Sequence, residues 1–181
     1  MNLSTSEKKR KPLKKITKTR LQNIGLYYLQ RFESSVQNLR SVLRRRVDRY
    51  AFENKEFNKL EAYGWIEDLL EDFAKKNYVS DERYGVLKVR DYIESNKPVR
   101  YIKNKLKTKG IDEKTIDALI ENENIDEAQM ALNFAKKKKI GPFRENEDAA
   151  AQNRQKDMAT LLRAGFEYDV VCNVLSANFD A

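Results

Sequence analysis

The sequence contains no histidine, a single cysteine, six glycines and three prolines among its 181 residues. Without histidine, a zinc site would need almost only carboxylate ligands, and one cysteine cannot form a disulfide within the chain. The scarcity of glycine and proline argues against an all-β fold, which needs many turns. No apolar run approaches the ~18 residues of a membrane span, and the N-terminus lacks the apolar segment of a signal peptide. We therefore expect a soluble, cytoplasmic, helical protein without a metal site.

Sequence motifs for catalysis are also missing. The chain has no glycine-rich phosphate loop, no G-x-S-x-G nucleophile elbow and no Cys/His pair. Carboxylate pairs such as Glu67 with Glu71 occur on charge-rich helical segments, where solvated surface is the ordinary interpretation. Cys172 lies among valines without cationic neighbours, so we expect a buried core residue rather than a reactive thiol. These absences predict a protein that is not an enzyme, with no catalytic residues and no cofactor.

Positive charge is concentrated at the N-terminus. The formal net charge is +8, and residues 1–20 hold eight lysines or arginines against one acid. The remaining chain is close to neutral but segregated, since residues 31–49 contain six arginines and residues 111–127 contain seven acids. A polar, basic segment interrupted by proline is typical of disorder. We therefore expect a flexible basic N-terminal arm over residues 1–19 and a folded domain over residues 20–181.

Beyond the arm, apolar residues recur at three- and four-residue steps, which predicts α-helices almost without interruption. One long helix is predicted over residues 57–77, and Gly64 would be a weak point or bend within it. The residues predicted to cap helices at their N-termini are Ser34 or Ser35, Ser80 and Asp112.

The segment around Gly110 resembles the segment around Gly165, about 55 residues later. Each glycine is predicted to end a helix as a left-handed cap, and such an offset is within the range of helical repeat units. The matched apolar pairs are Leu106 with Leu161, Ile111 with Phe166, and Ile116 with Val171. The match fails upstream, where Asp157 takes the position of Ile102. We predict an all-α fold, an elongated array of three tandem three-helix repeats over residues 20–78, 79–123 and 124–181.

Clusters of basic residues in successive predicted repeats are the candidates for binding a partner or a nucleic acid. They are Arg31, Arg40, Arg44, Arg45, Arg46, Lys103, Lys105, Lys107, Lys109, Lys136, Lys137, Lys138 and Lys139. Basic residues late in a helix also complement its dipole, and this explains any one cluster equally well. Clusters in three successive repeats could instead align into a stripe that contacts phosphates or an acidic protein groove.

Four segments, taken in order, carry a resemblance to a known family. They read YLQRFESS at 28–35, YVSDERY at 78–84, LKTKGI at 106–111 and LLRAGFEYDV at 161–170. This ordered set is similar to the RecX family of RecA recombinase modulators. The resemblance implies a helical, non-enzymatic regulator of homologous recombination, DNA repair and the SOS response. Such a protein lies in the groove of the RecA–DNA filament and alters filament growth, strand exchange and co-protease activity.

The chain departs from the family pattern in its basic arm and in a longer connection over residues 141–151. Two other interpretations stay open: a helical protein that binds DNA non-specifically through its basic clusters, and a passive scaffold for another protein. A helix-turn-helix reader of base sequence is disfavoured, because the helices after the two glycines begin with acids such as Asp112 and Glu167. No long heptad seam remains once the core is assigned, so we expect a monomer.

Overall fold

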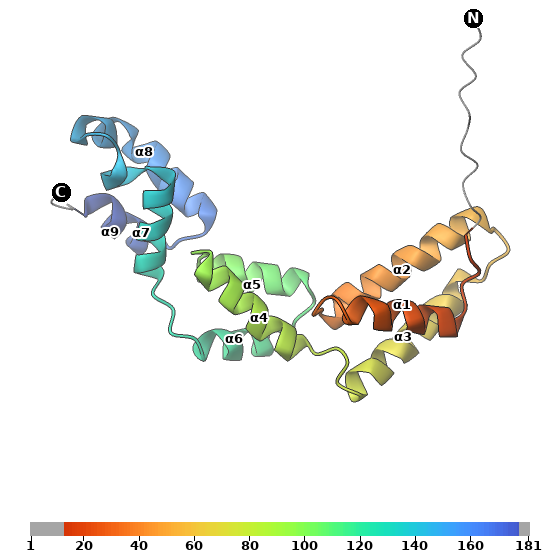
Figure 1. The fold of residues 1–181 in the computed structure, drawn as a ribbon. Coiled ribbons are helices and arrows are strands. Elements are labelled where there is room, and N and C mark those ends of the chain that lie inside the picture. The colour runs from red at the N-terminus through yellow and green to blue at the C-terminus, as the bar shows by residue number, and fades with distance from the viewer. Residues whose placement is uncertain (1–12, 178–181) are drawn as a thin grey trace, which may run out of the picture. The chain divides into compact units, whose positions relative to one another are not determined.

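The computed structural model describes residues 13–177, and every regular element in this range is helical (Figure 1). In chain order the elements are α1 (Lys18–Leu29), α2 (Val36–Glu53), α3 (Lys59–Lys75), α4 (Asp81–Glu94), α5 (Val99–Thr108), α6 (Glu113–Glu121), α7 (Glu127–Lys138), the 3₁₀ turn η1 (Gly141–Phe143), α8 (Glu147–Ala164) and α9 (Tyr168–Ser176). The predicted all-helical fold is confirmed for this part of the chain. Most of the predicted basic arm, residues 1–12, lies outside the described residues.

The described residues form two compact units. One contains residues 13–33 and 39–79, and the other contains residues 34–38 and 80–177. None of the described helices is both long and apolar enough to cross a membrane. The elongated array of three tandem repeats stays a prediction.

The core of the first unit is built by α1, α2 and α3. Leu21, Leu43 and Phe73, one from each helix, are completely buried. Helices α1 and α3 approach closely at Gly25, where an added Cβ would lie 2.7 Å from a ring carbon of Phe73. Because protein interiors are close-packed, a larger residue at Gly25 would displace that ring.

Helix α3 is shorter than the predicted span and is unbroken. The Asn58 side chain accepts a hydrogen bond from the backbone N–H of Glu61 and fixes the start of the helix. The helix ends before Asn77, because that residue adopts a left-handed backbone with a φ of 56°. The expected weak point at Gly64 does not interrupt α3, since apolar side chains buried on both sides of the glycine hold the helix against the core.

The second unit contains one apolar cluster in α4–α6 and another in α7–α9. Gly110 and Gly165 follow α5 and α8 with φ angles of 79° and 108°, in the left-handed region that favours glycine. The matched apolar residues are buried in both clusters: Leu106, Ile111 and Ile116 in one, and Leu161, Phe166 and Val171 in the other. The predicted equivalence of the two glycine turns is therefore confirmed.

The predicted N-caps are confirmed, and one of them makes a long-range contact. Ser80 and Asp112 accept hydrogen bonds from the third residue after each of them. Ser35 Oγ accepts from the backbone N–H of Asn38 at 3.1 Å and donates to the carbonyl oxygen of Lys109 at 2.7 Å. This buried serine thus joins the first turn of α2 to the end of α5 within the second unit.

Asp157 breaks the repeat pattern because it anchors the connection between α7 and α8. Its side chain is 2% exposed and accepts hydrogen bonds from the Gly141 backbone N–H at 2.8 Å and from Arg144 Nε and Nη2 at 2.8 and 2.7 Å. Burial raises the pKa of Asp157, but the hydrogen bonds from Arg144 and Gly141 outweigh burial and hold the pKa below its ordinary value. A buried carboxylate is tolerated only with such partners.

Cys172 is only partly buried, so the prediction of a buried core residue is wrong at this position. Its neighbours Val171 and Val174 point into the core of α7–α9. Cys172 follows Val171 by one position, which rotates its side chain by about 100° around the helix, away from that face.

Candidate functional site

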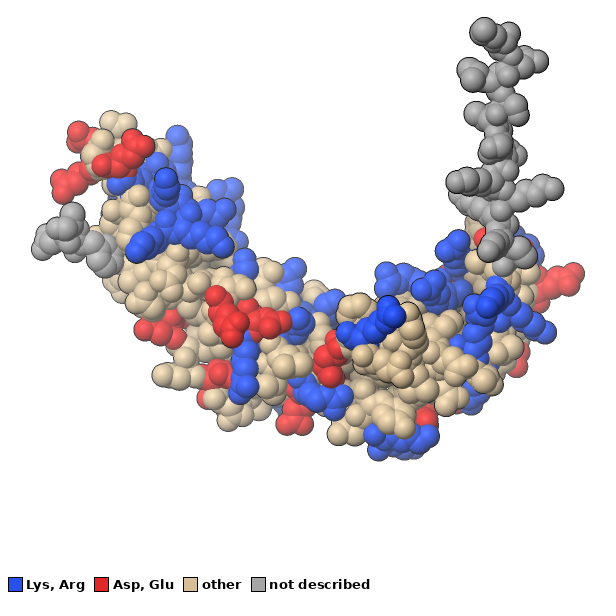
Figure 2. Space-filling view, viewed as in Figure 1, with Lys and Arg blue, Asp and Glu red and all other residues tan. Residues whose placement is uncertain are grey.

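The predicted basic residues differ in how many of their charges are already paired within the chain. Within each unit, the face seen in Figure 2 shows lysine and arginine side chains in separate patches with acidic side chains between them. No group of three His, Cys, Asp or Glu side chains in residues 13–177 is arranged to hold a metal ion.

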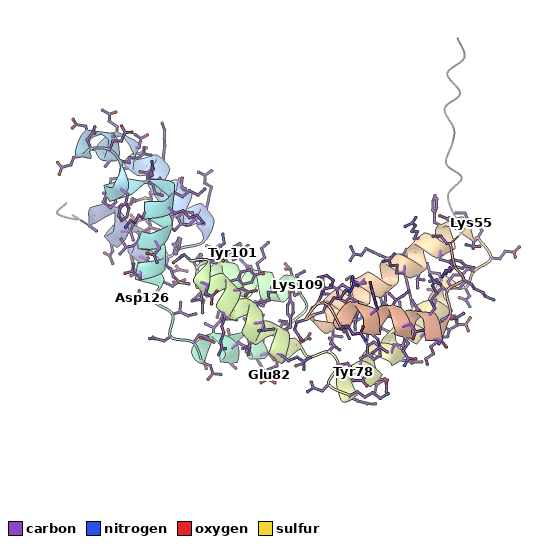
Figure 3. The ribbon with its side chains drawn as sticks, in the orientation of Figure 1. Lys55, Tyr78, Glu82, Tyr101, Lys109 and Asp126 are labelled. Carbon is purple, nitrogen blue, oxygen red and sulfur yellow. The ribbon has the colours of Figure 1, made fainter. Side chains whose placement is uncertain are left out.

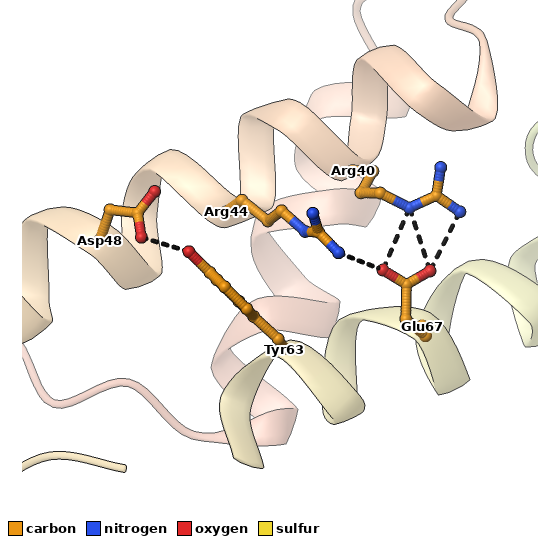
Figure 4. Close-up of polar contacts among 5 residues, drawn as sticks. All are labelled: Arg40, Arg44, Asp48, Tyr63 and Glu67. Carbon is orange, nitrogen blue, oxygen red and sulfur yellow. Dashed lines mark hydrogen bonds and ion pairs between the residues drawn. The ribbon is translucent and has the colours of Figure 1, made fainter. Parts of the chain in front are cut away.

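Arg40 and Arg44 of α2 are directed toward α3, where both pair with Glu67 (Figure 4). Arg40 Nε lies 3.1 and 3.0 Å from the two Glu67 oxygens, and Arg44 Nη2 lies 2.9 Å from Glu67 Oε1. Every fourth residue of α2 presents the same face, so Asp48 follows in line and accepts a hydrogen bond from Tyr63. The Glu67 side chain is 44% exposed, so solvent screens these pairs and each contributes only about 1 kcal/mol or less.

Asp48 also pairs with Lys59, whose Nζ lies 2.6 Å from the carboxylate. Hydrogen bonds from Lys59 and Tyr63 lower the pKa of Asp48, and the hydrogen bond to Asp48 raises the pKa of Lys59. The guanidinium of Arg44 lies 4.8 Å from the Tyr63 ring centroid. The α2–α3 side of the first unit is therefore a network that pairs most of its own charges.

The remaining predicted cations of the first unit are exposed. Arg45 donates from Nε to the backbone carbonyl of Ser41, and Arg46 and Arg45 form no ion pair with the described residues. The guanidinium of Arg31, just beyond α1, lies 4.3 Å from the centroid of the exposed Tyr27 ring. Among the predicted binding residues of this unit, Arg31, Arg45 and Arg46 thus remain available to a partner.

Two of the α5 lysines are held by acids of α6. Lys103 Nζ lies 2.7 Å from Asp117, and Lys107 Nζ lies 2.7 Å from Glu113. The hydrogen bond to Asp117 raises the pKa of Lys103. The acid-rich segment 111–127, identified in the sequence as a separate feature, therefore partly neutralises the basic cluster before it.

The other two lysines of this cluster, Lys105 within α5 and Lys109 directly after it, contact neutral groups. Lys105 Nζ lies 5.3 Å from the centroid of the Tyr101 ring, and Lys109 Nζ donates to the Asn38 side chain at 3.3 Å. Tyr101 and Lys109 lie at opposite ends of this segment in Figure 3. The four lysines are thus spread over different contacts instead of forming one unpaired patch.

The last basic cluster, which we call the α7 lysine cluster, comprises Lys136, Lys137, Lys138 and Lys139. All four side chains are exposed, and within the described part of the chain none forms an ion pair. Their place at the end of α7 suits the negative end of the helix dipole. Of all the predicted residues, this cluster presents the most unpaired charge.

One member of the α7 lysine cluster also lines a surface cavity of about 490 Å³ within the second unit. Lys138 shares it with Lys97, Arg163 and the aromatic residues Tyr101 and Phe134. Lys97 and Arg163 were missed by the sequence analysis because each stands outside a basic run. Their proximity depends on the packing of α5, α7 and α8, which no local pattern reveals.

Comparison with known proteins gives consistent results in sequence and in structure, although no family model matches the chain. A regulatory protein RecX from Myxococcus xanthus (strain DK1622) is 32% identical over 168 residues, which cover 91% of this chain and 89% of that protein. A regulatory protein RecX from Neisseria gonorrhoeae (strain NCCP11945) is 30% identical over 137 residues, 76% of this chain and 85% of that protein.

Two solved structures have a similar fold. The crystal structure of RecX from Lactobacillus salivarius gives a TM-score of 0.64 at 21% identity, covering 87% of this chain and 94% of that chain. Another crystal structure of a regulatory protein RecX gives a TM-score of 0.65 at 19% identity, covering 87% of this chain and 70% of that chain. At these identities the structures establish the fold alone. The sequence relationship rests on the two RecX proteins from Myxococcus xanthus and Neisseria gonorrhoeae.

Proposed function

The chain belongs to the RecX family of regulatory proteins, and from that premise we propose that it regulates RecA by binding the RecA–DNA filament. The observation that carries the proposal is the similarity to a RecX protein over 91% of the chain. We propose further that it inhibits the recombinase, ATPase and co-protease activities of RecA. It would act in the cytoplasm as a monomer without a cofactor, in DNA repair and the SOS response.

The unpaired cations are the proposed contact surface. The α7 lysine cluster, together with Arg31, Arg45 and Arg46, presents charge that no described acid neutralises. Exposed cations of this kind steer association with an acidic protein surface or with phosphates, both of which a nucleoprotein filament offers. Arg40, Arg44, Lys103 and Lys107 would contribute less, because a partner must first displace their acids.

The test is the single-stranded-DNA-dependent ATPase of RecA, titrated with the full-length protein. The double variant Lys136→Gln/Lys137→Gln removes two unpaired charges from the end of α7. Its matched control is Lys75→Gln/Lys76→Gln, which removes two charges from the end of α3 that are paired with Glu71 and Asp72. We expect the first variant to need about tenfold more protein for half-inhibition, since ~0.7 kcal/mol for each lost contact gives that factor.

Two results would contradict this proposal. Wild-type protein that leaves ATPase and strand exchange unchanged at stoichiometric ratios would refute RecA regulation. Equal weakening by both double variants would leave regulation standing but remove the α7 lysine cluster from the contact surface.

The contribution of the basic arm is tested with a chain that starts at Leu13. A chain that starts after Thr17 would lack two residues that the first helix needs. Ile16 is buried, and the Thr17 side chain caps α1 by accepting from the Arg20 backbone N–H at 3.2 Å. Inhibition retained by the shortened chain would place the activity in the helical part. Inhibition lost by it would place the activity in residues 1–12.

Non-specific DNA binding is the second candidate, and the same unpaired lysines favour it. Each phosphate contact to single-stranded DNA contributes about −0.7 to the slope of log K against log salt. Salt-sensitive binding to bare DNA, together with an unchanged RecA ATPase, would support DNA binding in place of filament regulation.

A further inference from the structure

A surface cavity of about 260 Å³ in the first unit lies beside the start of α1 and is lined mainly by cations. Its lining residues are Leu13, Lys14, Ile16, Arg20, Ile24, Arg46, Arg49 and Tyr50. Four of these eight residues are positively charged and none is acidic. They come from the segment before α1, from α1 and from the second half of α2, so the fold gathers charges that lie far apart in the sequence.

The cations around this cavity lack internal partners. None of the four forms an ion pair with another described residue, although nearby lysines such as Lys18 do. The Arg20 Nε–H group is buried and has no hydrogen-bond partner within residues 13–177. A buried donor without an acceptor destabilises the folded protein, and gathered like charges repel one another. An anion in the cavity would relieve both costs.

The start of α1 adds to the positive potential. The helix begins at Lys18 and has no acid in its first turn, so no carboxylate offsets the partial positive charge of the helix N-terminus, although the Thr17 hydroxyl caps the Arg20 N–H. Helix N-termini and arginines are both well suited to binding phosphate groups. Three of the four cations are arginines, whose several donors suit an anion with several acceptor oxygens.

The size of the cavity limits the ligand. A volume of about 260 Å³ lies below the ~300–1,000 Å³ of sites that enclose drug-sized ligands, so the cavity can enclose only the phosphate group and a small part of a larger ligand. We propose that this cavity binds the phosphate group of a small phosphorylated ligand, such as a diphosphate, a free nucleotide or the phosphorylated end of a nucleic-acid strand. Leu13, Ile24 and Tyr50 would contact the uncharged part of that ligand.

The experiment uses full-length protein alone, without RecA, so that its outcome is independent of the proposed function. Inorganic pyrophosphate is titrated by calorimetry in chloride buffer, and the unfolding midpoint is followed in parallel. We expect saturable one-to-one binding and a midpoint that rises with pyrophosphate concentration. Arg46→Gln/Arg49→Gln should weaken binding at least tenfold, whereas the charge-matched Lys75→Gln/Lys76→Gln variant should bind within twofold of wild type. Arg46 and Arg49 are exposed, so both variants should fold.

A second arm identifies the source of the phosphate. Fluorescence anisotropy compares a 5′-phosphorylated oligodeoxynucleotide with the same strand bearing a 5′-hydroxyl. A preference for the phosphorylated strand that disappears in the Arg46→Gln/Arg49→Gln variant would identify a nucleic-acid end as the ligand. Binding of pyrophosphate without such a preference would point to a free nucleotide or diphosphate. Equal weakening in the control variant, or neither saturable pyrophosphate binding nor a preference for the 5′-phosphate, would overturn the proposal.

Discussion

Replacing Asp157 with alanine tests whether the buried carboxylate holds the connection between α7 and α8. The substitution removes the acceptor of three hydrogen bonds, one from the Gly141 backbone and two from Arg144. It leaves the Gly141 N–H without this acceptor and the Arg144 guanidinium without its counter-ion. The helix itself should be unaffected, because alanine is the best helix former.

The expected loss of stability follows from the burial of each partner. Removing one member of a buried ion pair costs about 3–5 kcal/mol, but the Arg144 side chain is 25% exposed and regains part of its hydration. The lost acceptor of the Gly141 N–H, which alone costs about 1–3 kcal/mol, is part of this loss and is not added to it. We therefore expect Asp157→Ala to lower the free energy of unfolding by about 2–4 kcal/mol. For a chain of this size, the unfolding midpoint should fall by about 4–16 °C.

Thermal and urea unfolding at several pH values measure this loss. Burial raises the pKa of Asp157, but the hydrogen bonds from Arg144 and Gly141 leave it below the ordinary value of 3.8. A carboxyl whose pKa is depressed by folding contributes stability above its unfolded-state pKa and loses it as the pH falls through its folded-state pKa. The difference between wild type and variant should therefore be complete at pH 7 and shrink below about pH 3.8.

Asp148→Ala is the matched control, since it removes an exposed acid from the first turn of the same helix. We expect that control to cost no more than about 1 kcal/mol, the usual contribution of a charge near a helix N-terminus. If Asp157→Ala were no more destabilising than Asp148→Ala, the anchoring role would be refuted. Combining Asp157→Ala with Arg144→Ala should cost less than the sum of the single changes, because no unpaired guanidinium remains.

Three further substitutions test other parts of the structure. Ser35→Ala should cost about 1–3 kcal/mol in urea unfolding, because the Lys109 carbonyl and the Asn38 N–H both lose a partner; an unchanged midpoint would contradict this role. Gly110→Ala should cost at least about 1–2 kcal/mol in the same assay, because the residue holds a φ of 79° and an added Cβ would lie 2.5 Å from Gln37 Cβ; a neutral effect would contradict this argument. Glu67→Gln should cost less than about 1 kcal/mol, because its pairs are solvent-exposed. It should also strengthen binding to single-stranded DNA in a salt titration by releasing Arg44 from its ion pair, and weaker binding would count against that release.

The elements that the sequence predicted correctly depend on local chemistry. Ser80 and Asp112 cap the turn that immediately follows them, and Gly110 and Gly165 supply a backbone conformation that other residues avoid. The predicted helix ends differ from the observed ones by a few residues, as at Asn77. This non-glycine residue takes a left-handed conformation, which the apolar periodicity does not reveal.

The pairing of the basic residues could not be predicted in the same way. Arg40 is 27 residues from Glu67, and nothing in the spacing of charges along α2 indicates which of them will face α3. The sequence therefore named Arg40 and Arg46 as equivalent candidates, although one is paired with an acid and the other lines a cavity. Asp157 is likewise only a mismatch with Ile102 in the aligned sequence, because its contacts with Arg144 and Gly141 depend on the folded structure.

Those three residues also have a consequence for how members of the family diverge. If the residue at position 157 becomes apolar, Arg144 no longer has a carboxylate to pair with. An acid at position 157 without Arg144 and the Gly141 N–H would destabilise the folded protein. We expect the residues to be gained and lost together among related proteins. Relatives with an apolar residue at the position of Asp157 should then also tolerate a connection of different length between the helices that correspond to α7 and α8.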